Sequence, residues 1–212
     1  MFVFLMMLSS AMLFAQAKHN GRVTTTTEKS AIHTPMPDVN QSLKKIYSNL
    51  GKKKTDLFLD TNGWTVAGVN AGIGVTQYVA IPFTPKSNSH VTQTQVAVEW
   101  VQGDNQVNFS LYTDNSGIPG TLIAGPVTVT GLATFGTCCQ LAVANFTSTA
   151  VTAGTQYWVV ADEPTSGPGS NTWGAWAFVP NLFPFSFNQG SGWLAADGAS
   201  AEAAGAVYGT VP

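Results

Sequence analysis

Charged residues are scarce in this 212-residue chain, where they make up 9% of the sequence. Only three histidines and two cysteines are present, so a zinc site built from two cysteine pairs is excluded. No G-x-S-x-G motif occurs, which removes the usual signal of a serine hydrolase elbow. No apolar run reaches the ~18 residues that a transmembrane helix needs, and we expect no membrane span in the mature protein.

The first seventeen residues, MFVFLMMLSSAMLFAQA, are the most apolar part of the chain. The run is too short for a stable membrane span, and Ala15-Gln16-Ala17 matches the small-residue pattern of a cleavage site. We therefore predict a signal peptide at residues 1–17 and a secreted, extracellular protein. Export also places the cysteines where a disulfide persists.

Charge divides the rest of the chain into two parts. Residues 18–54 hold eight basic and two acidic side chains, whereas Lys86 is the single basic residue after position 54, among nine acids. The Thr/Pro-rich segment 18–54 is predicted to be a mostly disordered basic leader. Residues 55–212 are predicted to form the folded domain, and with so few cations this domain is not expected to bind nucleic acid.

Alternation of apolar and polar residues predicts strands throughout this domain. In QVNFSLYT, Val107, Phe109 and Leu111 alternate with polar or amphipathic neighbours. Further strands are expected at 76–83, 95–101, 126–131, 138–146, 155–161, 172–178 and 205–211. No segment shows a convincing helical period, so the predicted fold is an all-β, antiparallel β-sandwich of jelly-roll type.

Several short motifs occur in a fixed order along residues 46–210. They are IYSNLG (46–51), GW (63–64), YVAIPFTP (78–85), QVAVEWVQGDNQVNFSLYTDNSGIPGTLI (95–123), FGTCC (135–139), VTAGTQYWVV (151–160), TWGAW (172–176), GW (192–193) and VYGT (207–210). This order resembles the bacterial choice-of-anchor R domain family. The resemblance implies an exported β-sandwich domain displayed at a bacterial cell surface. The chain ends at Pro212 without an anchor, which favours free secretion.

The two cysteines, Cys138 and Cys139, are adjacent in TFGTCCQL. Neighbouring side chains of a regular strand point to opposite faces, so a bond between these two requires a turn at the strand entrance. Gly136 would tolerate the unusual backbone of such a turn. A vicinal disulfide is the favoured interpretation, and two free thiols or an intermolecular bond are the alternatives.

The residues that are suited to catalysis or to metal binding do not form a recognisable constellation. Asp114 is the single carboxylate of the DNSGIPG loop, so a plain turn is favoured there over a calcium site. His90 has no carboxylate nearby in sequence. A glycosidase needs two facing acids, and Glu99 with Asp162 is one such pair, although Glu99 is predicted to face outward. No catalytic residue and no cofactor are therefore predicted.

All six tryptophans fall in the predicted domain, and they suggest a ligand. Sugar rings stack on exposed aromatic side chains beside amide groups. Trp100 and Trp158 are predicted to be core, whereas Trp173, Trp193, Asn171 and Asn188 form the candidate glycan-binding surface. The favoured function is a non-catalytic extracellular module for surface display, adhesion or matrix, with a polysaccharide or cell-surface glycan as ligand. A secreted carbohydrate-active hydrolase and a strand-exchanging assembly subunit are the alternatives.

Overall fold

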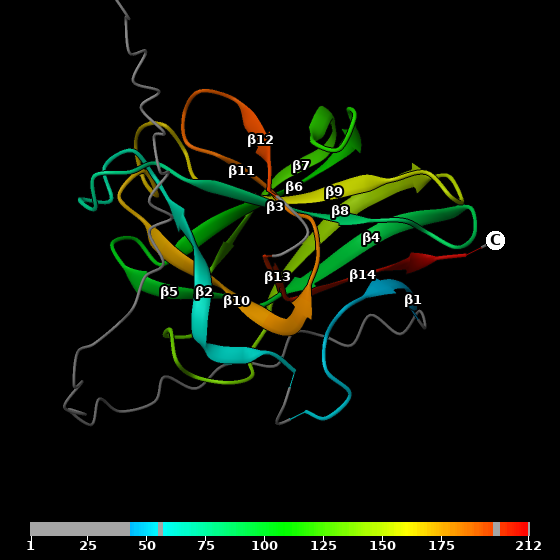
Figure 1. The fold of residues 1–212 in the computed structure, drawn as a ribbon, viewed down its shortest axis with the longest axis horizontal. Coiled ribbons are helices and arrows are strands. Elements are labelled where there is room, and N and C mark those ends of the chain that lie inside the picture. Colours follow the sequence, from blue (N-terminus) through cyan, green and yellow to red (C-terminus); the bar gives the residue numbers. More distant parts are fainter. Residues whose placement is uncertain (1–42, 55–56, 197–199, 212) are drawn as a thin grey trace, which may run out of the picture.

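The computed structural model describes residues 43–54, 57–196 and 200–211, in which fourteen strands and no helix occur (Figure 1). The predicted signal peptide and leader residues 18–42 lie outside these ranges. The strands are β1 (Lys44–Ser48), β2 (Leu59–Ala67), β3 (Tyr78–Phe83), β4 (Ser89–Val96), β5 (Val98–Gln102), β6 (Gln106–Asp114), β7 (Pro119–Thr130), β8 (Ala142–Val151), β9 (Tyr157–Asp162), β10 (Trp173–Leu182), β11 (Ser186–Asn188), β12 (Trp193–Ala195), β13 (Ala201–Ala203) and β14 (Gly205–Thr210). The described part of the chain includes no long apolar helix of the kind that crosses a membrane.

The strands form three antiparallel sheets, and the predicted all-β sandwich is confirmed. Sheet A has the order β1-β14-β4-β8. In sheet B, β10 pairs with β2 along one edge and with β5 and β13 along the other. Sheet C has the order β12-β11-β3-β9-β6-β7.

Sheets A and B are two halves of one layer, because two strands pass from one sheet to the other. Alternation predicts one continuous strand at 95–101. In the structure a longer run, from Ser89 to Gln102, divides at Ala97 into β4 of sheet A and β5 of sheet B. Its partner divides at Ala204 into β13 and β14. The two alanines meet, since the amide of Ala97 donates to the carbonyl of Ala204 at 3.0 Å. A corner of this kind needs small residues, because two backbones approach closely there.

The main core lies between this layer and sheet C. Ile81 from sheet C, Val96 from sheet A and Trp176 from sheet B all belong to the same buried cluster. Trp176 is fully buried, and its indole N–H donates to the carbonyl of Ala204 at 2.8 Å. A buried aromatic of this size is among the largest single contributions to a core, typically ~3–5 kcal/mol on truncation to alanine.

A second apolar cluster covers the outer face of sheet B. Ala97, Ala177, Val179 and Ala204 point to this side, and Phe58 packs over them. The partly buried members are Leu50, Leu57, Cys139 and Leu141. Loop residues therefore cover this part of the outer face of sheet B.

The folded domain begins before residue 55, the boundary that the charge pattern suggested. Strand β1 lies within the predicted leader and pairs with β14 along the edge of sheet A. The Tyr47 hydroxyl donates to Glu202 at 2.7 Å, and the Asn49 side chain both donates to Ala203 and accepts from Gly205. This lysine-rich segment can form an edge strand of sheet A because its lysines remain exposed, while Ile46 and Tyr47 pack on the core.

Candidate functional site

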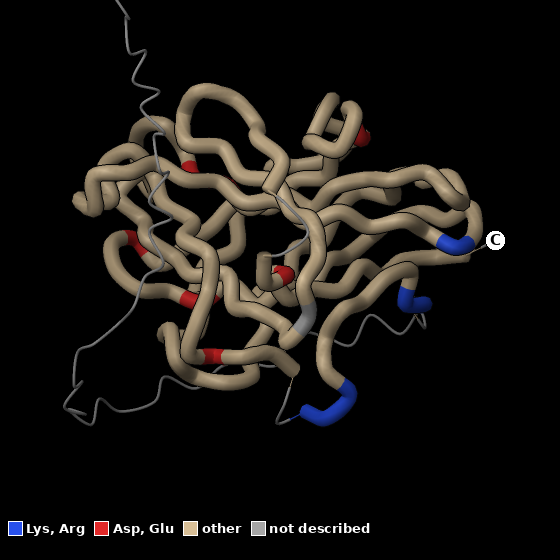
Figure 2. The backbone as a smooth tube through the Cα atoms, in the orientation of Figure 1, with Lys and Arg blue, Asp and Glu red and all other residues tan. Residues whose placement is uncertain are grey.

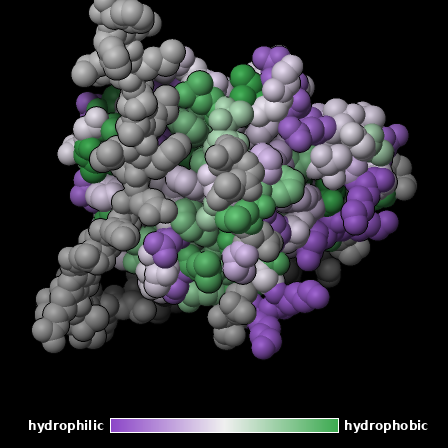
Figure 3. Space-filling model, in the orientation of Figure 1, coloured by the Kyte–Doolittle hydropathy of each residue, from purple (hydrophilic) through white to green (hydrophobic). Residues whose placement is uncertain are grey.

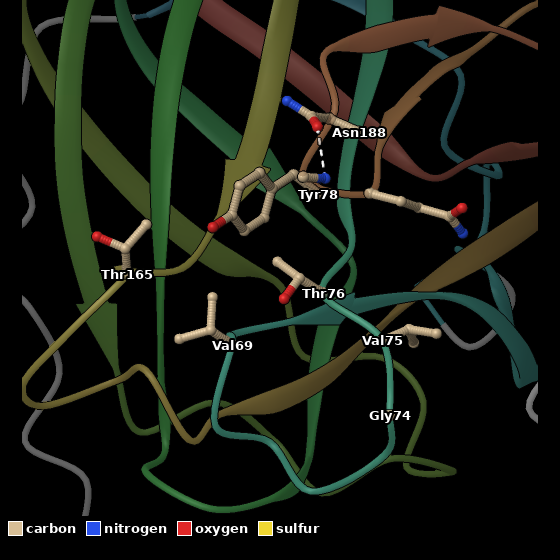
Figure 4. Close-up of a pocket in the computed structure, with 9 residues that line it drawn as sticks. Val69, Gly74, Val75, Thr76, Tyr78, Thr165 and Asn188 are labelled. Atoms are coloured by element: carbon tan, nitrogen blue, oxygen red, sulfur yellow. Dashed lines mark hydrogen bonds between the residues drawn. The ribbon is translucent and has the colours of Figure 1, made fainter.

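A cleft of about 550 Å³ opens where three connections meet at one end of sheet C. The connections are the β2–β3 loop (68–77), the β9–β10 loop (163–172) and the β11–β12 turn (189–192). The cleft is lined by Val69, Gly74, Val75, Thr76, Tyr78, Thr165, Asn188, Gln189 and Gly190 (Figure 4). Figure 4 shows the phenol of Tyr78 pointing toward the Thr165 side, with Val69 and Thr76 beside it.

Local hydrogen bonds hold two of these connections in place. Ala67 and Gln77 exchange backbone hydrogen bonds of 2.8 and 3.0 Å, which close the base of the β2–β3 loop. The Asn188 side-chain oxygen accepts from the amides of Gly190 and Gly192 at 2.8 and 3.2 Å, which closes the hairpin turn. Gly190 and Gly192 both have a positive φ, a conformation that glycine adopts without steric cost. The cleft walls are thus fixed by backbone contacts and by the Asn188 side chain, and Gln189 Nε2 donates to Gln77 Oε1 at 2.8 Å across them.

Tyr78 is the aromatic residue of the cleft, and it is half-buried at the start of β3. Its backbone pairs with Asn188 of β11, which brings the phenol and the amide to the same wall. Burial, with smaller effects from the negative charges of Asp162 and Glu163, raises the pKa of Tyr78. The phenol therefore stays protonated at neutral pH and is able to donate a hydrogen bond. Sequence reasoning missed Tyr78, because no local signal shows which loops converge on it.

Two buried acids lie behind this wall at the end of β9. Glu163 is 3% exposed, and neither of its carboxyl oxygens has a hydrogen-bond partner among the described residues. Burial, followed by the charges of Asp162 and Asp104, raises the pKa of Glu163 to about 9. Burial also raises the pKa of Asp162 to about 6, although a hydrogen bond with the Asn108 side chain lowers it. Glu163 is consequently neutral at physiological pH.

Basic side chains are absent from the cleft lining. Figure 2 shows the described lysines toward the side of β1 and the C-terminus, and Figure 3 shows hydrophilic side chains gathered on that side too. The cleft offers hydroxyls, amides, one phenol and two exposed valines. A phosphate or a carboxylate ligand would find no counter-charge there, whereas a neutral hydroxyl-rich ligand would find both donors and apolar contacts.

The four residues predicted from sequence do not form one surface. Asn188 lines the cleft, and Trp193 lies opposite it in the β11–β12 hairpin. The Trp193 ring packs on the outer face of sheet C against Trp158. Trp173 begins β10 in sheet B, half-buried, with an indole N–H that has no partner in the described residues. The exposed Asn171 uses its side-chain oxygen to accept from the amide of Asp104 at 3.0 Å.

Trp158 is a buried core residue, as predicted, whereas Trp100 is only partly buried. Trp158 is buried, yet it belongs to a small cluster with Ala80 and Val160 on the outer face of sheet C. Trp100 is only partly buried, and its indole N–H donates to the carbonyl of Gly103 at 3.1 Å. Strand alternation gives the face of a side chain, but it does not tell which faces are covered.

Glu99 is not solvent-exposed, although strand alternation places it on the outward face of its strand. Glu99 is fully buried on sheet B and interacts with Asp60 of β2. Burial raises the pKa of Glu99 to about 7, against the opposing effect of a hydrogen bond from the amide of Gly136. The outward face of the strand was predicted correctly, but the loop after β7 covers it.

Cys138 and Cys139 form the predicted vicinal disulfide. They lie in the loop between β7 and β8, not in the entrance of a strand, because β8 begins at Ala142. The peptide bond between them is cis, and Gly136 has a φ of 89°. Cys138 is exposed, whereas Cys139 is partly buried against the outer cluster of sheet B.

The carboxylate of Asp114 is engaged by N–H donors. Its Oδ1 atom accepts from Gln156 Nε2 at 2.7 Å and from Trp158 Nε1 at 2.8 Å, and the amide of Gly117 lies 3.2 Å away. These contacts join the DNSGIPG turn to β9. In the described ranges no group of three or more His, Cys, Asp or Glu side chains is arranged to hold a metal ion.

Comparison with known proteins places this chain in no group. No family model matches the sequence, and no curated protein matches it.

Proposed function

We propose that the protein is an extracellular, non-catalytic β-sandwich module that binds a neutral glycan in the cleft around Tyr78. Secretion and surface display, as implied by the predicted signal peptide and by the resemblance to choice-of-anchor R domains, are part of this proposal. The observation that carries it is the cleft lining, which combines an aromatic ring and exposed valines with hydroxyl and amide groups and has no basic side chain.

The chemistry of the lining matches a sugar better than other small ligands. A pyranose ring presents an apolar C–H face, which packs on the phenol ring or on Val69 and Val75. Its hydroxyls both donate and accept, so they pair with Thr76, Thr165 and the amide groups. The cleft is open to solvent, which suits a segment of a long polysaccharide more than a small buried ligand.

The acids near the cleft are the reason to keep a hydrolase as the second candidate. Glycosidases place two carboxyl groups on opposite sides of the scissile bond, about 5 to 9 Å apart. Asp162 and Glu163 are instead consecutive residues behind one wall, and neither lines the cleft. This arrangement supports binding over hydrolysis.

Isothermal titration calorimetry of the secreted protein with a panel of soluble neutral polysaccharides tests the proposal. We expect saturable binding that Tyr78→Ala weakens by about tenfold, equivalent to ~1.4 kcal/mol. Tyr208→Ala is the matched control, because Tyr208 is a half-buried tyrosine on sheet A. Trp193→Ala and Trp173→Ala test the two aromatic residues that the sequence suggested.

Three outcomes would contradict this function. Binding that is equally weakened by Tyr208→Ala would show a general loss of structure and not a site at Tyr78. Release of reducing ends from any polysaccharide, abolished by Asp162→Asn, would make the protein a hydrolase. If no polysaccharide of the panel gives a binding signal in the calorimeter, the glycan proposal fails for those sugars.

A further inference from the structure

The two sulfur atoms of the Cys138–Cys139 disulfide have different environments. Cys138 is exposed to solvent at the tip of the loop 134–141. Cys139 is partly buried and packs against the outer cluster of sheet B, which includes Phe58 and against which Leu50 and Leu57 also pack. An attacking group from solvent therefore has access to the Cys138 side of the bond.

The backbone of this loop is bound to sheet B by two carboxylates. The amide of Gly136 donates to Glu99 at 3.1 Å, and the amide of Cys138 donates to Asp60 at 3.1 Å. The Cys138 sulfur also lies 4.0 Å from the carbonyl oxygen of Phe58. The disulfide is consequently held over the segment that enters β2.

The described residues 49–54 and 57–58, together called segment 49–58, lie between β1 and β2. The amide of Gly51 donates to the carbonyl of Leu57 at 2.9 Å, and Leu50 and Leu57 pack on the same cluster as Cys139. Lys52, Lys53 and Lys54 are exposed on it. The contact of the Cys138 sulfur with Phe58 and the shared cluster thus join this segment to the disulfide loop.

We propose that Cys138–Cys139 is a thiol-exchange site that a small thiol enters through Cys138, and that the intact bond holds segment 49–58 against sheet B. A thiolate attacks the Cys138 sulfur and forms a mixed disulfide with it. The bond to Cys139 breaks, and its electron pair leaves on the Cys139 sulfur, which takes a proton from solvent. A second thiolate attacks the outer sulfur of the mixed disulfide, so that two thiols become one disulfide and both cysteines are reduced.

We expect the thiol to attack Cys138 because the rate of thiol–disulfide exchange depends on solvent access to the sulfur, together with the chemistry of the two sulfurs. We expect segment 49–58 to be released because reduction changes its packing. Reduction converts one compact bridge into two separate thiols, and Cys139 is then free to leave the cluster that Leu50 and Leu57 share. The segment loses a packing partner, whereas β1 keeps its own hydrogen bonds to β14.

Peptide mapping of the full-length protein after brief exposure to reduced glutathione and acid quenching tests the entry point. We expect the trapped glutathione adduct on Cys138 in excess over Cys139 by on the order of tenfold. The single variants provide a second measurement, since Cys139→Ser leaves only Cys138 and Cys138→Ser leaves only Cys139. The lone Cys138 should react with a disulfide reagent faster than the lone Cys139.

Timed trypsin digestion with and without a phosphine reductant tests the holding role. We expect reduction to speed cleavage after Lys52, Lys53 and Lys54 several-fold, while cleavage after Lys86 serves as an internal control in the β3–β4 connection. The Cys138→Ser/Cys139→Ser double variant should be cleaved at the faster rate with or without reductant.

Different results would contradict the exchange site and the holding role of the disulfide. An adduct mainly on Cys139, or a bond that glutathione leaves intact, overturns the exchange site. Complete reduction with unchanged cleavage after Lys52–Lys54 overturns the holding role. These results do not depend on the cleft, so they are independent of the glycan proposal.

Discussion

Replacement of Glu163 by glutamine should make the protein more stable at alkaline pH. Glu163 has a pKa raised from 4.5 to about 9 by burial and by two nearby acids. Between these two values the folded protein holds one more proton than the unfolded chain, so raising the pH favours unfolding. The slope for one such group is about −1.4 kcal/mol per pH unit in the free energy of unfolding.

The size of the effect follows directly from that slope. Between pH 6 and pH 8 the wild-type protein should lose about 2.7 kcal/mol through Glu163 alone. Glutamine has nearly the same shape as a protonated glutamic acid, so Glu163→Gln should lie within about 1 kcal/mol of the wild type at pH 5. At pH 8 the variant should exceed the wild type by about 4 kcal/mol, because it has no proton to lose.

Urea unfolding followed by tryptophan fluorescence, repeated from pH 5 to pH 8.5, measures this difference. The decisive window is pH 7.5–8.5, since Asp162 and Glu99 have pKa values of about 6 and about 7 and are mostly ionised there. Glu99→Gln is the matched control, and it should flatten the curve below pH 7 while remaining parallel to the wild type above it. If Glu163→Gln and the wild type are parallel between pH 7.5 and 8.5, Glu163 is not the proton-holding group and the reasoning fails.

Three further substitutions test the packing in urea unfolding experiments. Asp114→Ala should lower the free energy of unfolding by about 2–3 kcal/mol, because it leaves the Trp158 N–H buried without an acceptor; a loss below 0.5 kcal/mol would contradict this. Trp176→Ala should cost ~3–5 kcal/mol through the cavity that it leaves, and a fully folded variant of near wild-type stability would refute the core assignment. Gly209→Ala should cost more than ~1 kcal/mol, because a Cβ atom there would overlap the carbonyl of His90, and an unchanged midpoint would show that β14 shifts freely.

Local alternation was enough to predict several strands, and it failed where long-range contacts decide the outcome. The pattern at Val107, Phe109 and Leu111 places all three in the core, where they are found fully buried. The same rule treated the run through Ala97 as one continuous strand. The division of that run between two sheets depends on the carbonyl of Ala204, more than a hundred residues away in sequence. No local pattern carries that information.

The candidate site shows the same limit. Asn188 and the adjacency of Cys138 and Cys139 were visible in the sequence, because an amide near a turn and two neighbouring cysteines are local features. Tyr78 was not identified, since its role depends on three connections that meet only in the folded chain. Glu99 was assigned to an exposed face because its strand period is clear, whereas the covering loop lies about forty residues further on.

The sequence by itself determined the β class, most strand positions, the scarcity of cations in the domain and the adjacency of the only two cysteines. These properties depend on composition and on contacts between near neighbours, which a one-dimensional pattern records. Only the tertiary structure decided which faces are covered, that β1 joins sheet A, that Glu163 and Glu99 are buried, and that a cleft forms around Tyr78. Burial depends on the summed contacts of distant segments, and it is burial that sets the pKa values and the ligand chemistry of this protein.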